Sequence, residues 1–268
     1  MESLSSGIQY RHWPVQDAKA CILLMHGLAE HTGRYERLAA YFNARNIAVV
    51  GPDHIGHGAS PGTRAHVTQF SDYLVPLIEL RDAISGWYPD TPIFTLGHSM
   101  GGLIAAHLLL QDAQSYRGAM FSAPAFAADE VVSPVTLWLG RLLRAVLPKI
   151  GMMSLEASQI SRDPAVVADY VADPLVYNGK ITAALGMELL SAMSDAISGA
   201  QHITLPVYIA HGEADVMAMP DGSRAFFQAL GSQDKTLDWW PDLYHEIFNE
   251  PESEAVMARF AEWLEAHL

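Results

Sequence analysis

The stretch TPIFTLGHSMGGLIAAHLLL, residues 91–110, decides the fold class of this 268-residue chain. It begins as a short apolar run of the kind found in strands that are buried on both faces. Glycines interrupt the run, and small and apolar residues suited to a helix follow. Ser99 stands in the break, between His98 and Met100. The stretch therefore predicts a strand, a tight turn and a helix, with one hydroxyl at the turn.

Strand and helix patterns alternate on both sides of this stretch. The alternation predicts an open, mostly parallel, doubly wound α/β sheet, whose ligands bind at the carboxyl ends of the strands. Strands are predicted at 19–27, 47–53, 91–98, 116–124, 205–215 and at the start of 235–248, and helices at 34–46, 70–89, 100–113 and 251–268.

The alternation stops for residues 125–204, which are too many for an ordinary crossover. This stretch is not linker-like, because 133–148 and 180–199 carry apolar helical patterns. We therefore predict an α/β core made of residues 1–124 and 205–268, with a helical cap of residues 125–204 inserted into it.

Composition excludes several classes of protein. The formal net charge of −14 disfavours binding to nucleic acid or to an anionic membrane surface. Cys21 is the only cysteine, so an intrachain disulfide is impossible. No apolar run has the length of a membrane span, and the first residues do not form a secretory signal. We expect a cytoplasmic protein that could also contact a membrane peripherally.

Residues 97–101, GHSMG, match the G-x-S-x-G pattern of a nucleophile elbow. Glycines on both sides allow a strand-to-helix turn that is too tight for larger side chains, and the serine is left exposed at the helix start. An ordinary glycine turn is the alternative. The apolar strand before the motif and the small-residue helix after it favour Ser99 as a nucleophile.

A serine nucleophile needs a histidine base and an orienting carboxylate, which in this architecture follow it in the order acid, then histidine. The strand at 205–215 ends with Glu213 and Asp215, and the turn that HGEAD provides favours Asp215. His245 follows the last predicted strand. The only later histidine, His267, lies in the terminal helix and is expected to be solvated.

An oxyanion hole needs two backbone N–H donors. The residue after the nucleophile, Met100, supplies one candidate. The loop after the first buried strand supplies the other at Leu28.

The remaining histidines do not suggest a metal site. His26, His31, His54 and His57 lie in two loops without the further ligands that zinc sites bring at matched spacing. Structural or solvated roles are expected for them, and the chemistry requires no metal or organic cofactor.

Several of these motifs together resemble the monoacylglycerol lipases of the α/β-hydrolase superfamily. They are MHGLAEHTGRYERLA, PDHIGHGASPG, GHSMGG, HGEAD and YHEIFNE, and the resemblance covers roughly residues 8–266, cap included. It implies Ser99, Asp215 and His245 as the catalytic triad and Leu28 and Met100 as oxyanion donors.

The resemblance also implies that Glu30 and Arg34 brace the oxyanion loop, and that Tyr170 contacts the glycerol end of the substrate. Two positions depart from some relatives: Phe248 replaces a second histidine, and Ala218 replaces a cysteine after the triad acid. These departures concern the alcohol pocket and thiol-directed inhibition, not the acyl-transfer chemistry.

The predicted function is hydrolysis of monoacylglycerols to fatty acid and glycerol through an acyl-enzyme. A lysophospholipase or a broad carboxylesterase is the alternative, and a non-catalytic α/β-hydrolase-fold binding protein is a lesser one. A lipid ester is the expected partner. The apolar cap residues either line an acyl tunnel and touch lipid transiently, or pack on the core. They are Leu137, Leu142, Leu143, Val146, Leu147, Ile150, Met152 and Met153.

Overall fold

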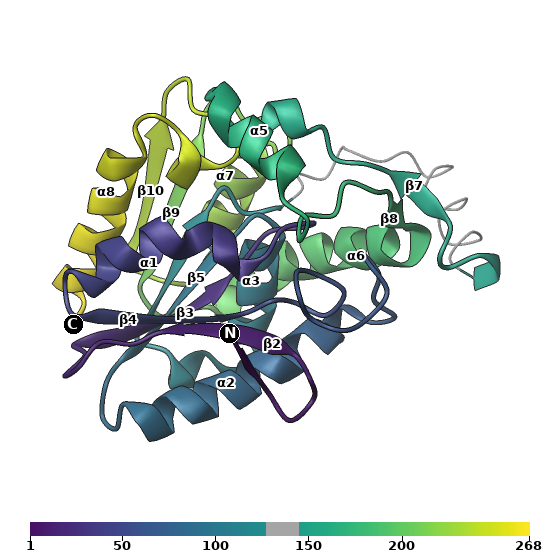
Figure 1. Cartoon of the computed structure of the whole chain (residues 1–268). Helices are drawn as coiled ribbons and strands as arrows, with labels where there is room; N and C mark the ends of the chain where they lie inside the picture. The colour runs from purple at the N-terminus through teal and green to yellow at the C-terminus, as the bar shows by residue number, and fades with distance from the viewer. Residues whose placement is uncertain (127–144) are drawn as a thin grey trace.

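The computed structural model describes residues 1–126 and 145–268, which form an eight-stranded sheet flanked by helices (Figure 1). The six strands from β4 to β10 are parallel, whereas β1 and β2 pair antiparallel at one edge. In sheet order, the strands are β1 (Glu2–Ser3), β2 (Gln9–Trp13), β4 (Ile47–Pro52), β3 (Ala20–Met25), β5 (Ile93–His98), β6 (Gly118–Ser122), β9 (Val207–Gly212) and β10 (Lys235–Trp240).

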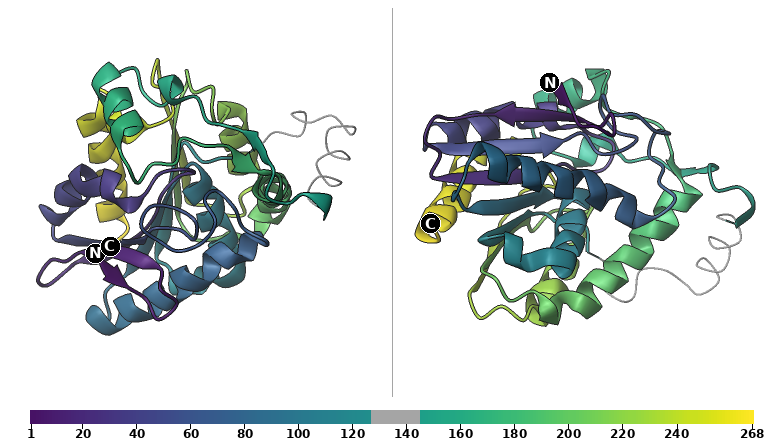
Figure 2. Two further views of the ribbon diagram at one scale, coloured as in Figure 1. Left: turned by 45° about the vertical axis from the view of Figure 1, so that its right-hand side comes forward. Right: turned by 90° about the horizontal axis from the view of Figure 1, so that it is seen from below.

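Helices cover both faces of the sheet (Figures 1 and 2). One apolar cluster joins α1 (Glu36–Asn43) and α8 (Ser253–Ala266) to one face. A larger cluster joins four helices to the other face: α2 (Leu74–Trp87), α3 (Met100–Asp112), α6 (Ala183–Gly199) and α7 (Pro220–Ala229). Short 3₁₀ helices occur at η1 (Thr32–Tyr35), η2 (Phe70–Tyr73), η3 (Ala113–Ser115), η4 (Ala157–Gln159), η5 (Ala200–His202) and η6 (Ile247–Asn249).

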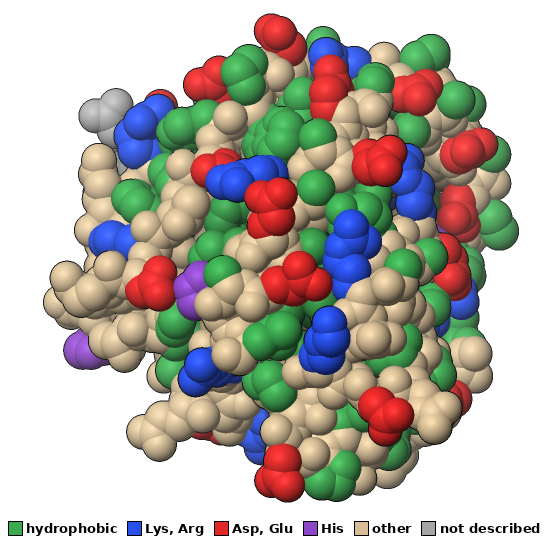
Figure 3. All heavy atoms as spheres, turned by 90° about the vertical axis from the view of Figure 1, so that its left-hand side faces the viewer, with side chains coloured by type: hydrophobic (Ala, Val, Ile, Leu, Met, Phe, Trp, Pro, Cys, Tyr) green, Lys and Arg blue, Asp and Glu red, His purple; other side chains and the backbone are tan. Residues whose placement is uncertain are grey.

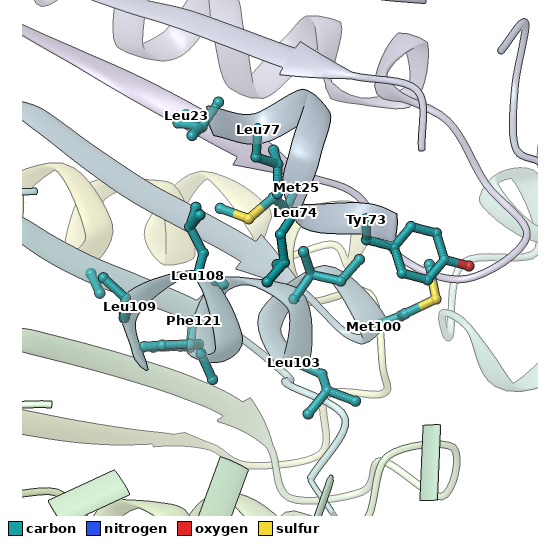
Figure 4. Close-up of a cluster of buried hydrophobic side chains, with 14 of the residues drawn as sticks. Leu23, Met25, Tyr73, Leu74, Leu77, Met100, Leu103, Leu108, Leu109 and Phe121 are labelled. Carbon is teal, nitrogen blue, oxygen red and sulfur yellow. The ribbon is translucent and has the colours of Figure 1, made fainter. Parts of the chain in front are cut away.

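The alternation of side chains along the central strands explains why both faces need cover. Along β3, Ile22 and Leu24 pack against α1 and α8, whereas Leu23 and Met25 pack on the opposite side. Figure 4 shows part of that second layer, in which Met25 lies between the sheet and the helices that carry Leu74, Leu77 and Leu108. Burial on both faces is what the continuous apolar runs predicted.

The predicted strands and helices of the core are confirmed, with boundary shifts of a few residues. Three elements of the core were not predicted. The edge strand β1 is exposed, and β2 beside it is mostly half-buried, with a sequence, QYRHW, that lacks a continuous apolar run. Helix α7, with the sequence PDGSRAFFQA, is short and mixes polar and apolar residues, although its proline stands in the first turn.

The segment between β6 and β9 is only partly described. Of the predicted helix 133–148, residues 133–144 lie outside the described residues, together with Leu137, Leu142 and Leu143. The predicted helix 180–199 is confirmed as α6. The segment also contains α5 (Pro164–Ala172) and a two-stranded antiparallel ribbon, which was not predicted, made of β7 (Gly151–Met153) and β8 (Ile181–Thr182).

Helix α6 is anchored to the core rather than standing apart from it. Its residues Leu185, Leu189 and Ala192 belong to the same apolar cluster as α3. The carbonyl of Ala192 is 2.9 Å from His107 Nε2 of α3, and the N–H of Phe70 donates to Glu188 at 2.7 Å. Both apolar packing and polar contacts therefore hold α6 against the core.

The surface over α1 and α8 carries acidic and basic side chains interspersed with apolar ones (Figure 3). Arg259 of α8 pairs with Glu262 at 2.9 Å and with Asp238 at 3.1 Å. This face therefore offers no large basic patch. None of the helices within the described residues has the length and apolar character to cross a bilayer.

Candidate active site

Ser99 sits in a sharp turn between β5 and α3, where the sequence placed it. Its backbone has φ 52° and ψ −120°, a conformation that side-chain-bearing residues rarely adopt. The Ser99 N–H donates to the Ser122 carbonyl at 3.1 Å, and its own carbonyl accepts from the N–H groups of Gly102 at 2.9 Å and Ala125 at 3.0 Å. These bonds from neighbouring elements hold a turn whose strain is of the order of 1–3 kcal/mol.

The glycines of the motif are required by close backbone contacts. A Cβ at Gly101 would lie 2.0 Å from the Met25 carbonyl oxygen, and one at Gly97 would lie 2.4 Å from the Gly101 oxygen. Larger side chains would therefore force α3 away from β3 and β5. The motif thus has the mechanical setting that the elbow interpretation demands.

Asp215 and His245 come together although 30 residues separate them in sequence. His245 Nδ1 lies 2.7 Å from Asp215 Oδ2. The other oxygen of Asp215 accepts the N–H groups of Met217 at 2.7 Å and Ala218 at 3.0 Å. Glu213, the alternative acid, is exposed to solvent. The geometry thus brings Asp215, and not Glu213, to His245.

The electrostatics of this pair keep the carboxylate ionised and favour proton uptake by the histidine. Burial alone would lower the pKa of His245, but the Asp215 carboxylate outweighs it and raises that pKa above 6.5. Burial likewise opposes ionisation of Asp215, yet His245 and His211 bring its pKa below the usual range. Asp215 therefore stays charged wherever His245 titrates.

Ser99 and His245 line one pocket at the carboxyl ends of the strands, the edge at which such sheets bind ligands. Met100 lines it at the first turn of α3, where helix N–H groups lack intrahelical partners. Leu28 contributes from the loop after β3. The full lining is Gly27, Leu28, Glu30, His98, Ser99, Met100, Ala125, Leu155, Ile160, Tyr170, Leu189, Met193, Met217, Ala218, His245 and Glu246.

Glu30 and Arg34, which were predicted to brace the oxyanion loop, take part in a network of hydrogen bonds. Glu30 Oε1 accepts the Gly27 N–H at 2.6 Å, and Arg34 donates to Glu30 Oε2 at 2.8 Å. Arg34 also donates to both oxygens of Glu246, at 2.5 Å and 2.7 Å. Because Glu246 follows His245, this network ties the loop after β3 to the loop that carries the histidine.

Tyr170 of α5 lies at the end of the pocket that Glu30 and Glu246 line, which we call the polar end. Its side chain is buried, and the Arg34 guanidinium lies 4.7 Å from its ring centroid. This is a cation–π contact. The structure therefore brings Tyr170 to the pocket that Ser99 lines.

The four histidines of the two loops after β3 and β4 are buried. His26, His54 and His57 are in ring contact with one another, and burial leads the causes that lower the pKa of each of them. His31 Nε2 lies 2.8 Å from Asp173 of the inserted segment. Among residues 1–126 and 145–268, no three histidine, cysteine or acidic side chains are grouped as metal ligands.

Three side chains at the site were missed by the sequence interpretation. His98 packs against His245 with a centroid distance of 4.8 Å, and burial lowers the pKa of His98 to about 3. His211 Nε2 lies 3.0 Å from Asp215 Oδ2, and Glu246 binds Arg34. Each of the three residues belongs to a motif of the sequence: His98 to GHSMG, His211 to HGEAD and Glu246 to YHEIF. Membership of these motifs is the only sequence signal that could have identified them.

The chain is similar to known proteins over most of its length. The sequence model of the family described as "Serine aminopeptidase, S33" matches residues 16–252. A monoacylglycerol lipase of Mycolicibacterium smegmatis is 36% identical over 262 residues, covering 97% of this chain and 94% of that protein. A monoglyceride lipase of Rattus norvegicus is 33% identical over 242 residues, covering 90% and 80%.

A solved structure is similar over the whole length of the chain. The crystal structure of Paleococcus ferrophilus monoacylglycerol lipase superposes with a TM-score of 0.88 at 30% identity. The match covers 97% of this chain and 99% of that chain. The described part of the chain therefore shares the α/β-hydrolase fold of that protein.

Proposed function

The chain belongs to the serine aminopeptidase S33 family of hydrolases, and we infer that it is a serine hydrolase that cleaves monoacylglycerols to fatty acid and glycerol. The single observation that carries the chemistry is the strained Ser99 turn opening on the pocket that His245 also lines, with Asp215 behind the histidine. The similar proteins named above, monoacylglycerol and monoglyceride lipases, support the substrate. The protein is a carboxylic ester hydrolase.

We assign the triad roles from the geometry. Asp215 holds His245 through Nδ1, which leaves Nε2 to take the proton of Ser99 as its oxygen attacks the ester carbonyl. His245 then protonates the departing glycerol oxygen. Water, deprotonated by the same histidine, attacks the acyl-enzyme and releases the fatty acid, and Ser99 regains its proton.

The negative oxygen of each tetrahedral intermediate needs two N–H donors. We assign Met100, at the positive end of α3, and Leu28, in the loop braced by Glu30. Both residues line the pocket beside Ser99. The close approach of Gly27, whose added Cβ would be 3.3 Å from Ser99 Cβ, supports the assignment of this loop.

We also propose that residues 125–204 are a cap on a core of residues 1–124 and 205–268. The described part of this segment contributes Leu155, Ile160, Leu189 and Met193 to the pocket wall. These apolar side chains suit an acyl chain. Methionine adds pliability, because its thioether side chain adapts to irregular shapes.

Charge at the polar end favours a neutral alcohol over a phosphate headgroup. Glu30 and Glu246 line the pocket there, and the single guanidinium of Arg34 is shared between them. One positive and two negative charges leave an excess negative charge, which disfavours an anionic leaving group. We propose that the glycerol end binds here, against Tyr170.

We propose a transient apolar contact between the cap and lipid. Met152 and Met153 of β7 are 47% and 58% exposed, and Leu147 and Ile150 nearby are exposed as well. The overall negative charge leaves apolar insertion as the attractive interaction.

The decisive test is a substrate panel run on the wild type and on Ser99→Ala. The panel holds monoacylglycerols, diacylglycerols, lysophosphatidylcholine and p-nitrophenyl esters. We expect the highest kcat/KM on monoacylglycerol and no turnover above background for Ser99→Ala. Faster cleavage of lysophosphatidylcholine would overturn the substrate, and full activity of Ser99→Ala would overturn the mechanism.

A further inference from the structure

We propose that His26 is a positioning residue that fixes the Gly27–Leu28 peptide so that the Leu28 N–H points at the reacting carbonyl. The proposal rests on the oxyanion role assigned to Leu28 above. His26 itself touches no substrate, because its side chain is completely buried beneath the loop.

The contacts of His26 define which ring nitrogen carries the proton. The N–H of His54 donates to His26 Nε2 at 2.9 Å, so Nε2 must be the unprotonated nitrogen. The proton of the neutral ring is therefore on Nδ1, which lies 2.7 Å from the carbonyl oxygen of Gly27. His26 thus donates to that carbonyl as a single defined tautomer.

A bond to the Gly27 oxygen also orients the next N–H. In a trans peptide the C=O of one residue and the N–H of the following residue lie in one plane and point in opposite directions. Because the Gly27 oxygen is held toward the buried His26 ring, the Leu28 N–H is directed away from it. Within the described part of the chain, this N–H has no protein acceptor.

The neighbouring backbone groups of the loop are occupied. The Gly27 N–H donates to Glu30 at 2.6 Å, and the Ala29 carbonyl accepts the Tyr177 N–H at 2.8 Å. Ala29 itself has φ 68°, so the chain bends sharply just after the donor. The contacts of Gly27 and Ala29 hold the turn, and the His26 bond determines which way the free donor faces.

The surroundings keep the ring in this neutral form. Burial, followed by the nearby His57, lowers the pKa of His26 well below 6.5. The ring centroids of His54 and His57 lie 4.2 Å and 5.6 Å from that of His26. A second proton on Nε2 would displace the His54 N–H bond, so the packed cluster preserves the tautomer that the loop needs.

The test compares His26→Phe with His57→Phe. Both changes remove a buried imidazole from the same cluster, but the Nδ1 of His57 faces the Ile55 carbonyl and makes no bond to residues 27–29. His26→Asn, whose side-chain amide can donate to the Gly27 carbonyl, is the conservative variant. Each protein is assayed for kcat, KM, thermal stability and affinity for a trifluoromethyl ketone, which forms a tetrahedral adduct with the serine.

We expect kcat of His26→Phe to fall about 10- to 100-fold with KM nearly unchanged, somewhat less than the loss of a whole oxyanion donor. Affinity for the ketone should fall by a similar factor. His57→Phe should lose stability only, and His26→Asn should recover part of kcat.

A kcat of His26→Phe within twofold of the wild type, or equal losses of kcat in His26→Phe and His57→Phe, would overturn the proposal. If His26→Phe does not fold, His26→Asn and His26→Gln carry the same comparison of kcat with ketone affinity. Ser99→Ala in the same assay distinguishes a failure of the proposed function from a failure of the role proposed for His26. Activity in Ser99→Ala overturns the proposed function, whereas an inactive Ser99→Ala beside an unaffected His26→Phe overturns only the role of His26.

Discussion

The central parallel strands and strand β7 of the β7–β8 ribbon differ in the burial of their side chains. Every residue of β3, β5 and β9 is buried, whereas all three residues of β7 are exposed. The strands end at the pocket that Ser99 and His245 line. In Figure 1 the ribbon projects from the opposite side of the molecule to α8.

This difference separates two tasks. Reacting groups need positions held within fractions of an ångström, and a closely packed sheet supplies the rigidity that keeps the Ser99 turn strained. A lipid substrate must be taken from a dispersed or bilayer phase, which favours apolar side chains left in contact with water. We therefore expect changes at the strand ends to abolish turnover, and changes on the ribbon to alter only how lipid is reached.

The largest effect is expected from Asp215→Asn. The amide can still accept the Met217 and Ala218 N–H groups, but it cannot hold His245 in the required tautomer, so kcat should fall by about 10⁴-fold. Steady-state kinetics with circular dichroism of the variant measure this. Glu213→Gln, at an exposed position two residues earlier, is the control, and a large loss there would identify Glu213 as the acid.

Phe260→Ala tests the packing beneath the site. Phe260 of α8 is completely buried. Its ring centroid lies 4.7 Å from that of Tyr208 and 4.8 Å from that of Phe248. Removing the ring should lower the free energy of unfolding by about 3–5 kcal/mol. Urea denaturation measures the change, with Met153→Ala on the exposed strand β7 expected to stay within about 0.5 kcal/mol. Equal losses would contradict the contrast between the two regions.

The pH dependence should report the charge beside His245. The base must be neutral, so kcat/KM should fall about tenfold for each pH unit below the pKa of His245. Because Asp215 raises this pKa, the midpoint of the acidic limb should lie above 6.5. In Asp215→Asn the largest influence that opposes burial is lost and only the weaker ones of Glu246 and Glu30 remain, so the midpoint of the residual activity should move to lower pH. A limb that stays in place would show that the carboxylate does not control the histidine.

The smallest effect is expected from the double change Met152→Ser and Met153→Ser. Both side chains are largely exposed, so stability and turnover of a water-soluble p-nitrophenyl ester should stay unchanged. Activity on monoacylglycerol carried in neutral vesicles should fall about threefold, because apolar contact area is lost. An equal loss on the soluble ester would mean that the ribbon shapes the pocket rather than the lipid contact.

Local patterns in the sequence were sufficient for the elements of the core and for the order of the candidate residues. Apolar runs closed by glycine predicted the buried strands, because a strand covered on both faces has no room for polar side chains. The strands β1 and β2 have no such run and were missed, as was the short helix α7. The helix predicted at 133–148 lies mostly outside the described residues.

Sequence alone therefore determined the strand, turn and helix around Ser99, since glycine spacing and apolar periodicity are properties of neighbouring residues. It also ordered Ser99, Asp215 and His245 along the chain. Only the tertiary structure decided which acid faces His245, how Arg34 joins Glu30 to Glu246, which lies 212 positions after the arginine, and which nitrogen of His26 carries the proton. These contacts join residues that are distant in sequence or depend on orientation in space, and no local pattern encodes either.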